Sequence, residues 1–302
     1  MKQEGRRATD CSSCGTRSPL EIRIHDRNRR ITTEIFSYYR CPGCGLLFLA
    51  PIPRNLGDYY AGDYYGGAPT RQRLERAARL ERYKIEIVNR FLPEGRLLEI
   101  GPSYGAFALI AREAGFEVDT IELDADCCEF LREVVGVRAT QTADPVKELD
   151  GSGERYDVIA MWHNLEHVPN AHELFRVSAG ALRPGGVLVI AAPNPDAFQF
   201  SVLGSRWTHL DAPRHVLLMP ISRLEKWASE EGLRPVWITT RDRGSLEWNA
   251  FGWRETFAAS SRNRFLRFGL RILGSLVAVL AMPIERRERR GATYTAVMRK
   301  ES

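Results

Sequence analysis

The sequence lacks a long apolar run. A helix that crosses a bilayer needs roughly 20 consecutive apolar residues. No uncharged apolar run in the 302 residues reaches even about 18. We therefore expect no full membrane span. The first ten residues also lack the apolar segment of a secretion signal, so we expect a cytoplasmic protein.

A strong excess of one charge is also missing. The chain has 43 Lys and Arg against 38 Asp and Glu, a formal net charge of +5. Domains that bind nucleic acid usually concentrate more positive charge on one face, so we expect no nucleic-acid partner. The hydrophobic share of 44% is ordinary for a globular protein, and the length suffices for one large domain and one small one.

Cysteine is scarce, but four of the six cysteines form two CxxC pairs, each followed by glycine: Cys11, Cys14, Cys41 and Cys44. Without a secretion signal, such pairs indicate metal ligands rather than disulfides. Four thiolates close the coordination of a zinc ion, which predicts a structural zinc ribbon with strands near 21–24 and 34–39. Vicinal cysteines at 127 and 128 are expected to be packing residues, because their disulfide geometry is awkward.

The chain is organised around one strand, turn and helix. Residues 96–100 predict a buried parallel strand, and Gly101 and Gly105 open the helix that follows. Glu122 falls where the next strand should end, and a carboxylate there can bind ribose hydroxyls. Ser103 and Ala106 occupy positions that a dinucleotide-binding loop reserves for glycine. The segment therefore predicts a nucleoside site of another kind.

Strands and helices alternate after this unit, which predicts a parallel sheet covered by helices on both faces. The expected strands are 96–100, 117–122, 137–141, 156–161, 186–192, 234–240 and 294–298, and the expected helices are 70–91, 105–114, 125–135, 169–181 and 222–231. Ser222 and Glu225 predict a capping box at the start of the last helix.

Ionisable residues follow the fourth strand. Trp162, His163, Glu166 and His167 lie at its carboxyl end, where ligands bind in open α/β sheets. The irregular stretch 201–218 adds Trp207, His209, Asp211, Arg214 and His215, a composition that suits a substrate-binding loop. The tyrosine pairs at 59–60 and 64–65 predict either a lip of the pocket or packing of a linker.

The order of these motifs resembles the class I S-adenosylmethionine (SAM) dependent methyltransferases, over about residues 93–240 plus the last strand. The resemblance implies a doubly wound, mostly parallel sheet of seven strands with the last strand antiparallel. It implies SAM as cofactor, bound by Glu99, Gly101, Ser103, Gly105, Glu122, Trp162 and His163. Ser103 departs from the family, which usually has glycine there. The expected organisation is a zinc ribbon at 1–55, a linker and amphipathic helix at 56–92, and the methyltransferase domain at 93–302.

The zinc module, together with the segment from Cys44 to Phe48 and the tyrosines, is similar to a bacterial branch linked to polysaccharide and sugar modification. This similarity implies methyl transfer to a sugar, sugar nucleotide or lipid-linked saccharide. For a hydroxyl acceptor, histidine is the natural base, with His167 as first candidate and His215 as second. Two alternatives stay open: an RNA methyltransferase that uses the zinc ribbon for binding, and a non-catalytic module with this fold.

An insertion at about 250–290 departs from a minimal domain of this kind. Its apolar run 272–284 is flanked by arginines, which could place 264–290 in the interface of an anionic membrane, as a peripheral contact at its inner face. The alternative is a helical hairpin packed on the core or on a second subunit. The sequence leaves open the acceptor, the methylated atom and the oligomeric state.

Overall fold

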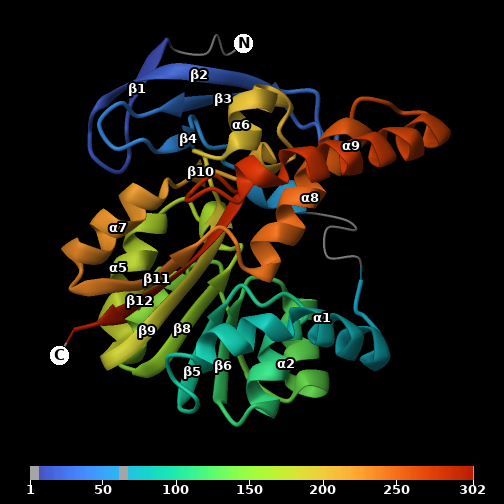
Figure 1. The fold of residues 1–302 in the computed structure, drawn as a ribbon. Helices are drawn as coiled ribbons and strands as arrows, with labels where there is room; N and C mark the ends of the chain where they lie inside the picture. Colours follow the sequence, from blue (N-terminus) through green and yellow to red (C-terminus); the bar gives the residue numbers. More distant parts are fainter. Residues whose placement is uncertain (1–6, 61–66, 302) are drawn as a thin grey trace.

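The computed structural model describes residues 7–60 and 67–301, which form two sheets with helices around them (Figure 1). The large sheet has seven strands in the order β11-β12-β9-β8-β5-β6-β7. The smaller sheet has five strands in the order β1-β2-β3-β4-β10 and lies at the other end of the molecule from β5 and β6.

The large sheet is built from the strands that the sequence predicts. They are β5 (Arg96–Ile100), β6 (Glu117–Glu122), β7 (Arg138–Gln141), β8 (Tyr156–Trp162), β9 (Leu182–Pro193), β11 (Leu233–Thr239) and β12 (Thr293–Lys300). β12 lies between β9 and β11 and pairs antiparallel with both, while the other pairs are parallel. The predicted seven-stranded, mostly parallel sheet with an antiparallel last strand is confirmed.

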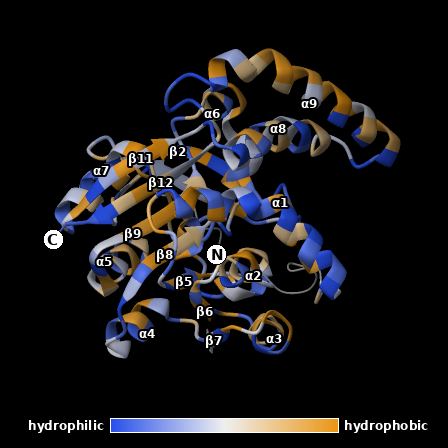
Figure 2. Ribbon diagram, turned by 60° about the horizontal axis from the view of Figure 1, so that its bottom comes forward, coloured by the Kyte–Doolittle hydropathy of each residue, from blue (hydrophilic) through white to orange (hydrophobic). Residues whose placement is uncertain are grey.

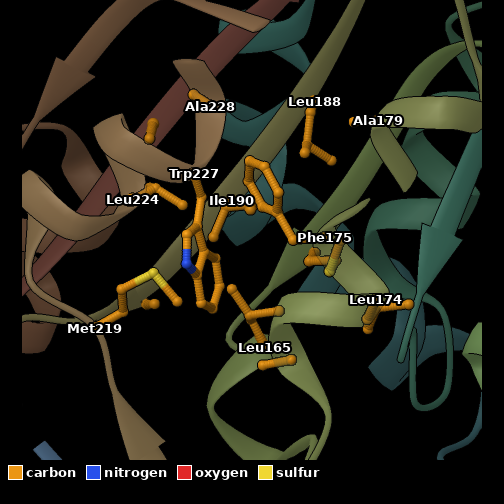
Figure 3. Close-up of a cluster of buried hydrophobic side chains, with 14 of the residues drawn as sticks. Leu165, Leu174, Phe175, Ala179, Leu188, Ile190, Met219, Leu224, Trp227 and Ala228 are labelled. Atoms are coloured by element: carbon orange, nitrogen blue, oxygen red, sulfur yellow. The ribbon is translucent and has the colours of Figure 1, made fainter. Parts of the chain in front are cut away.

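Helices cover both faces of this sheet. They are α1 (Arg71–Asn89), α2 (Ala106–Glu113), α3 (Ala125–Phe130), α4 (Pro145–Ser152), α5 (Ala171–Ala181) and α7 (Ile221–Glu230). The first three share a core with Leu97 and Val158, whereas α4, α5 and α7 share a second core with Ile159 and Ile190. Figure 3 shows Trp227 of α7 and Phe175 of α5 packed against Leu188 and Ile190 of β9 in that second core. Successive strand residues point to opposite faces, so both cores need apolar strands.

The small sheet contains β1 (Ala8–Asp10), β2 (Arg17–His25), β3 (Ile35–Arg40), β4 (Leu47–Leu49) and β10 (Leu217–Leu218). The strands predicted at 21–24 and 34–39 are confirmed within β2 and β3. β10 lies far from the other four strands in the sequence and pairs antiparallel with β4. The small sheet therefore includes residues beyond the predicted domain boundary at residue 55. A shared apolar core, with Tyr38, Trp207 and Leu210 fully or almost fully buried, joins this sheet to the segment around β10.

The insertion is a helical hairpin of α8 (Arg243–Ala258) and α9 (Arg264–Glu285). α9 extends away from the body of the molecule, and much of its surface is apolar (Figures 1 and 2). It is long and apolar enough to cross a membrane by length and composition, although its uncharged run is short, and only 17% of its most apolar window is buried.

Two local predictions are wrong. α7 begins after Pro220 without a side-chain cap, so the Ser222–Glu225 capping box does not form, and Glu225 binds Arg289 instead at 2.7 Å. The helix predicted over 125–135 is confirmed, with α3 continuing as a π-helical turn at Leu131–Val135. The stretch 201–218 is more regular than predicted, since it contains the end of α6 (Phe198–Leu203), two short 3-10 turns and β10.

Candidate active site

The four N-terminal cysteines lie together at one end of the small sheet. One thiol sulfur from each lies within 4.8 Å of the others. The backbone carbonyls of Cys11 and Cys41 each accept the N–H of the glycine four residues on, Gly15 at 2.9 Å and Gly45 at 2.8 Å, and both glycines have positive φ. Two matching knuckles of this kind fit a tetrahedral zinc site without an open position. The other two cysteines, at 127 and 128, are fully buried packing residues.

The contacts of Thr16 favour a thiolate in this cluster. Its hydroxyl, 3.3 Å from the Cys14 sulfur, and its backbone lower the pKa of Cys14 to about 6. A deprotonated thiol is the form that binds metal. A zinc ion held by four cysteines would therefore hold the base of the β2–β3 hairpin together and would take no part in chemistry.

The predicted cofactor loop follows β5. Gly101, Ser103 and Gly105 all have φ between +53° and +76°. Ser103 thus adopts the left-handed conformation that the family's usual glycine adopts without strain. Glu122, at the end of β6, accepts the Ser103 N–H at 2.8 Å through Oε2, and its Oε1 accepts the N–H of Leu123 at 2.8 Å. In this structure the carboxylate braces the loop, and its binding to ribose stays a prediction.

From β5 the chain adds β6 and β7 on one side of the sheet and then crosses to add β8 on the other side. Open α/β sheets bind ligands at such a switch point in the strand order, which here lies between β5 and β8. The loops after the two strands meet there: a Cβ on Gly101 would lie 2.0 Å from Nδ2 of Asn164. The Asn164 Oδ1 is buried and accepts no hydrogen bond from any described residue. A free amide oxygen beside a glycine-rich turn fits a polar ligand group such as the methionine end of SAM. The sequence predictions did not include Asn164.

Three other predicted cofactor residues surround this point. Trp162 packs edge-on against Phe107 of α2, with the ring centroids 5.4 Å apart. His163 has φ +54° and lies against Trp248 of α8, at 4.9 Å between ring centroids. Glu99 lies beneath the loop, where burial raises its pKa to about 8. Such a carboxyl would be largely protonated at neutral pH and would act as a hydrogen-bonding group rather than as a charge.

A cavity of about 550 Å³ lies beside His163. It is lined by the loop after β8, the segment before β10, the hairpin α8–α9 and the turn between β2 and β3. Both predicted catalytic histidines, His167 and His215, line it, so the structure brings together two residues that are far apart in the sequence. None of the zinc-site cysteines lines it.

Within this cavity, Glu166, His167 and His215 form a compact cluster. The two imidazole rings are 4.6 Å apart, and one ligand atom from each of the three residues lies within 4.8 Å of the others. Glu166 is 2% exposed, and burial opposes its charge, but the nearby rings of His163 and His215 outweigh this effect and lower its pKa to about 2. Burial and the neighbouring His215 lower the pKa of His167 to about 4, so its ring is neutral near pH 7.

The Nδ1 atoms of both histidines are already used. His167 Nδ1 lies 3.2 Å from the Arg214 carbonyl and 2.9 Å from the Tyr60 hydroxyl, and His215 Nδ1 lies 2.8 Å from the His209 carbonyl. The Nδ1 partner of His215 is a carbonyl, which can only accept, so this Nδ1 donates and Nε2 keeps a lone pair. His167 holds the same tautomer when its Nδ1 donates to the Arg214 carbonyl, and the opposite one when it accepts from the Tyr60 hydroxyl. Of the predicted tyrosines, Tyr60 contacts the cavity wall and Tyr59 packs on Phe36, while those at 64–65 lie outside the described residues.

One wall of the cavity is cationic. It contains Arg27, Arg29 and Arg30 from the turn between β2 and β3, and Arg267 from α9. The Nε atoms of Arg27 and Arg267 are buried and donate no hydrogen bond to any residue that the structure describes. Burial and the nearby Arg206 and Arg30 lower the pKa of Arg27. Arginines gathered on one wall, two of them with a buried nitrogen that donates to no described residue, suit a ligand that brings negative charge.

A buried ion pair fixes this wall to the rest of the site. Arg214 has no exposed surface and donates to Asp26 at 2.8 Å and to Asp211 at 2.9 Å. Asp26 directly follows β2, and its oxygens also accept the N–H groups of Arg29 and Ile31. Arg214 was predicted to belong to a substrate-binding loop, whereas residues 26–30 were not predicted to belong to the site. They reach it through Asp26, whose partner Arg214 lies 188 positions away in the sequence.

Known proteins resemble this chain in sequence and in fold. The model of a family described as a methyltransferase domain matches residues 73–237. A ubiquinone biosynthesis O-methyltransferase of Bordetella avium is 28% identical over 151 residues, which cover 46% of this chain and 62% of that protein. The corresponding protein of Xanthomonas campestris is 29% identical over 125 residues, 38% of this chain and 51% of that protein. The chain thus spans less than two thirds of the length of these relatives.

Solved structures share the fold at low identity. A geranyl diphosphate methyltransferase in complex with SAM superimposes with a TM-score of 0.51 at 20% identity, covering 82% of this chain and 94% of that one. The phosphoethanolamine N-methyltransferase 2 of Haemonchus contortus in complex with SAM gives 0.51 at 15% identity, covering 85% and 62%. These likenesses show the SAM-methyltransferase fold for this chain.

Proposed function

Because the chain belongs to the methyltransferase-domain family, matched over residues 73–237, we propose that it transfers the methyl group of SAM to a hydroxyl of a small, anionic acceptor. The observation that carries this proposal is the polar cavity lined by His163, whose neighbour in sequence, Asn164, lies against Gly101 of the glycine-rich loop after β5. When bound, SAM supplies a methyl group that its sulfonium makes electrophilic. The main task of the chain is then to hold the acceptor oxygen close to that methyl and in line with it.

The arginine wall supports an acceptor that carries a phosphate or carboxylate group. Arg27 and Arg267 each present a buried nitrogen without a partner among the described residues, and Arg30 stands beside them. A guanidinium binds phosphate through two parallel hydrogen bonds, which also fixes its orientation. A sugar nucleotide or a lipid-linked saccharide offers both a phosphate and free hydroxyls, so we propose this class of acceptor.

Removal of the hydroxyl proton is assigned to the cluster of Glu166, His167 and His215. An acceptor anchored at the arginine wall would reach this cluster within the same cavity. With both Nδ1 atoms donating, the two Nε2 atoms have free lone pairs, and the buried carboxylate of Glu166 adds negative charge beside them. His167 and His215 remain the candidates for the base.

We further propose that α9 rests on an anionic membrane. Its outward residues include Phe265, Phe268 and Leu280, which are 80%, 67% and 78% exposed. Arginines stand at both ends of the helix, at 262, 264 and 267 and at 286, 287 and 290, where they can contact lipid phosphates, whereas Arg271 and Arg289 already pair with Glu255 and Glu225. Burial of an apolar helix face with basic flanks is typical of peripheral membrane binding. A lipid-linked acceptor would reach the cavity from this side, because Arg267 belongs to both.

A transfer assay tests the proposed function. Purified protein and methyl-labelled SAM are incubated with an extract of the source cells, which is then separated into small-molecule, lipid, nuclease-sensitive and protein fractions. Label in the small-molecule or lipid fraction, reduced in the Arg27→Gln variant but not in Arg23→Gln, is the expected result. Label in the nuclease-sensitive fraction would instead assign the protein to nucleic-acid methylation. A protein that binds no SAM by calorimetry would contradict the proposal altogether.

A further inference from the structure

Glu166 is a buried carboxylate with no hydrogen bond. It is 2% exposed, and neither of its oxygens accepts a hydrogen bond from any residue in 7–60 or 67–301. The nearest printed contact is the ring nitrogen His163 Nδ1, 3.5 Å from Oε1, and Oε2 has no such contact. A buried carboxylate held this loosely costs free energy, so the structure favours a further partner that the protein chain does not supply.

The groups around Glu166 share one property, which is that each presents an unshared electron pair. His215 donates Nδ1–H to the His209 carbonyl, and His167 can donate Nδ1–H to the Arg214 carbonyl, an arrangement that leaves Nε2 as the free atom of each ring. Histidines that bind metal almost always donate their other nitrogen to a carbonyl or carboxylate in this way, which fixes the tautomer and the ring orientation. Backbone carbonyls hold both rings here, so their orientation does not depend on a ligand.

We propose that Glu166, His167 and His215 bind a divalent cation at the floor of this cavity. One oxygen and two nitrogens, one atom from each residue, lie within 4.8 Å of one another, and a single ion between them can draw them together through side-chain movements. Two histidines and one carboxylate are a known ligand set for divalent first-row metals, and three protein ligands leave positions open for an outside oxygen. The site is separate from the four cysteines, whose sulfurs favour zinc.

The role of this cation rests on the proposed function, whereas its presence does not. The acceptor hydroxyl would take an open position on the ion, and coordination lowers the pKa of that hydroxyl, so its proton leaves to solvent. The bond from oxygen to the methyl carbon then forms as the bond from that carbon to sulfur breaks, and the electron pair of the broken bond stays on sulfur. His167 and His215 would in this case hold the ion and not carry the proton themselves.

Manganese binding followed by electron paramagnetic resonance tests the site on the whole protein with its cysteine site filled with zinc. The signal of free Mn²⁺ falls as the ion binds, and the zinc-filled cysteines do not compete for it. We expect one Mn²⁺ per chain, with affinity lowered at least tenfold in Glu166→Gln and in His215→Asn. The matched control is His172→Asn, because His172 stacks on Trp227 with its ring centroid 4.6 Å away and lies outside the cluster.

The outcomes separate the two proposals. If the wild-type protein binds no Mn²⁺ up to about a millimolar, or if Glu166→Gln binds it as tightly as the wild type, the metal site is wrong. Glu166→Gln keeps the shape of the side chain, and an unchanged melting temperature would show that lost binding does not reflect unfolding. Methyl transfer that proceeds at full rate without added cation would refute the role of the ion in the reaction while leaving the proposed function intact. Bound Mn²⁺ without transfer to any fraction of the cell extract would contradict the function and not the site.

Discussion

We expect the loss of the Arg214 side chain to lower the stability of the protein strongly. Its guanidinium is fully buried between Asp26 and Asp211, and it makes four hydrogen bonds to them, between 2.8 and 3.4 Å. Replacement by methionine keeps most of the volume but leaves two buried carboxylates without their cation. Breaking a buried pair by removing one partner typically costs about 3–5 kcal/mol, and we expect Arg214→Met to lose that much stability.

Urea unfolding at pH 7 measures this loss, with Arg241→Met as the control because it replaces an exposed arginine. The effect should depend on pH in a definite direction. The guanidinium of Arg214 and nearby His215 hold the pKa of Asp211 well below its usual range despite burial. A lowered folded-state pKa gives stability that is present above about pH 4 and is lost as the pH falls toward the folded-state value. The difference between wild type and Arg214→Met should therefore shrink in acid.

Two results would refute this reasoning. A loss below about 1 kcal/mol would mean that Asp26 and Asp211 are adequately solvated or satisfied by their other partners, such as Asn28. A loss that stays constant from pH 7 to pH 3 would mean that the cost arises from packing and not from the unpaired carboxylates.

Three further predictions follow from other parts of the molecule. Cys44→Ser should abolish zinc binding, measured by metal analysis, and should expose the β2–β3 hairpin to proteolysis; a variant that keeps one zinc per chain would disprove the four-cysteine site. Ser103→Gly should relieve the left-handed backbone and raise stability by up to about 1 kcal/mol in thermal unfolding, and a less stable variant would contradict this. Leu280→Glu should reduce flotation with anionic vesicles, whereas Leu80→Glu, on α1, should not; equal flotation of both would argue against membrane contact by α9.

The large sheet could be predicted because its signals are local. The strand before Gly101 and the glycines that follow it encode their own geometry within a few residues, and every predicted strand of this sheet appears within a few residues of its expected ends. The capping box does not form because a contact between distant segments takes the place of the local one. Glu225, which the pattern assigned to a local cap, finds a partner in Arg289, 64 positions along the chain.

The sequence predicted only some of the residues that line the cavity proposed for the acceptor. The histidines stood out because they follow a strand end or lie in an irregular, ionisable stretch. The arginines of residues 27–30 carry no motif, and they belong to the cavity only because Asp26 meets Arg214 across the fold. Asn164 likewise shows its importance only through its approach to Gly101, which depends on how two neighbouring strands place their loops. Contacts between distant segments are what the local pattern of a single sequence does not contain.

The geometry of the β2–β3 hairpin indicates what a zinc site would do in an enzyme of this kind. The cysteine knuckles lie at its open end and the arginine turn at its closed end, and β2, nine residues long, separates them by roughly 30 Å. A small sheet has too little core to hold such a hairpin rigid. A zinc ion at the base would, together with the Asp26–Arg214 pair at the tip, fix the direction in which the arginines point. In this arrangement the turn of the small sheet forms part of the cavity wall, and a metal ion bound by the cysteines would act on the substrate through the position of that turn.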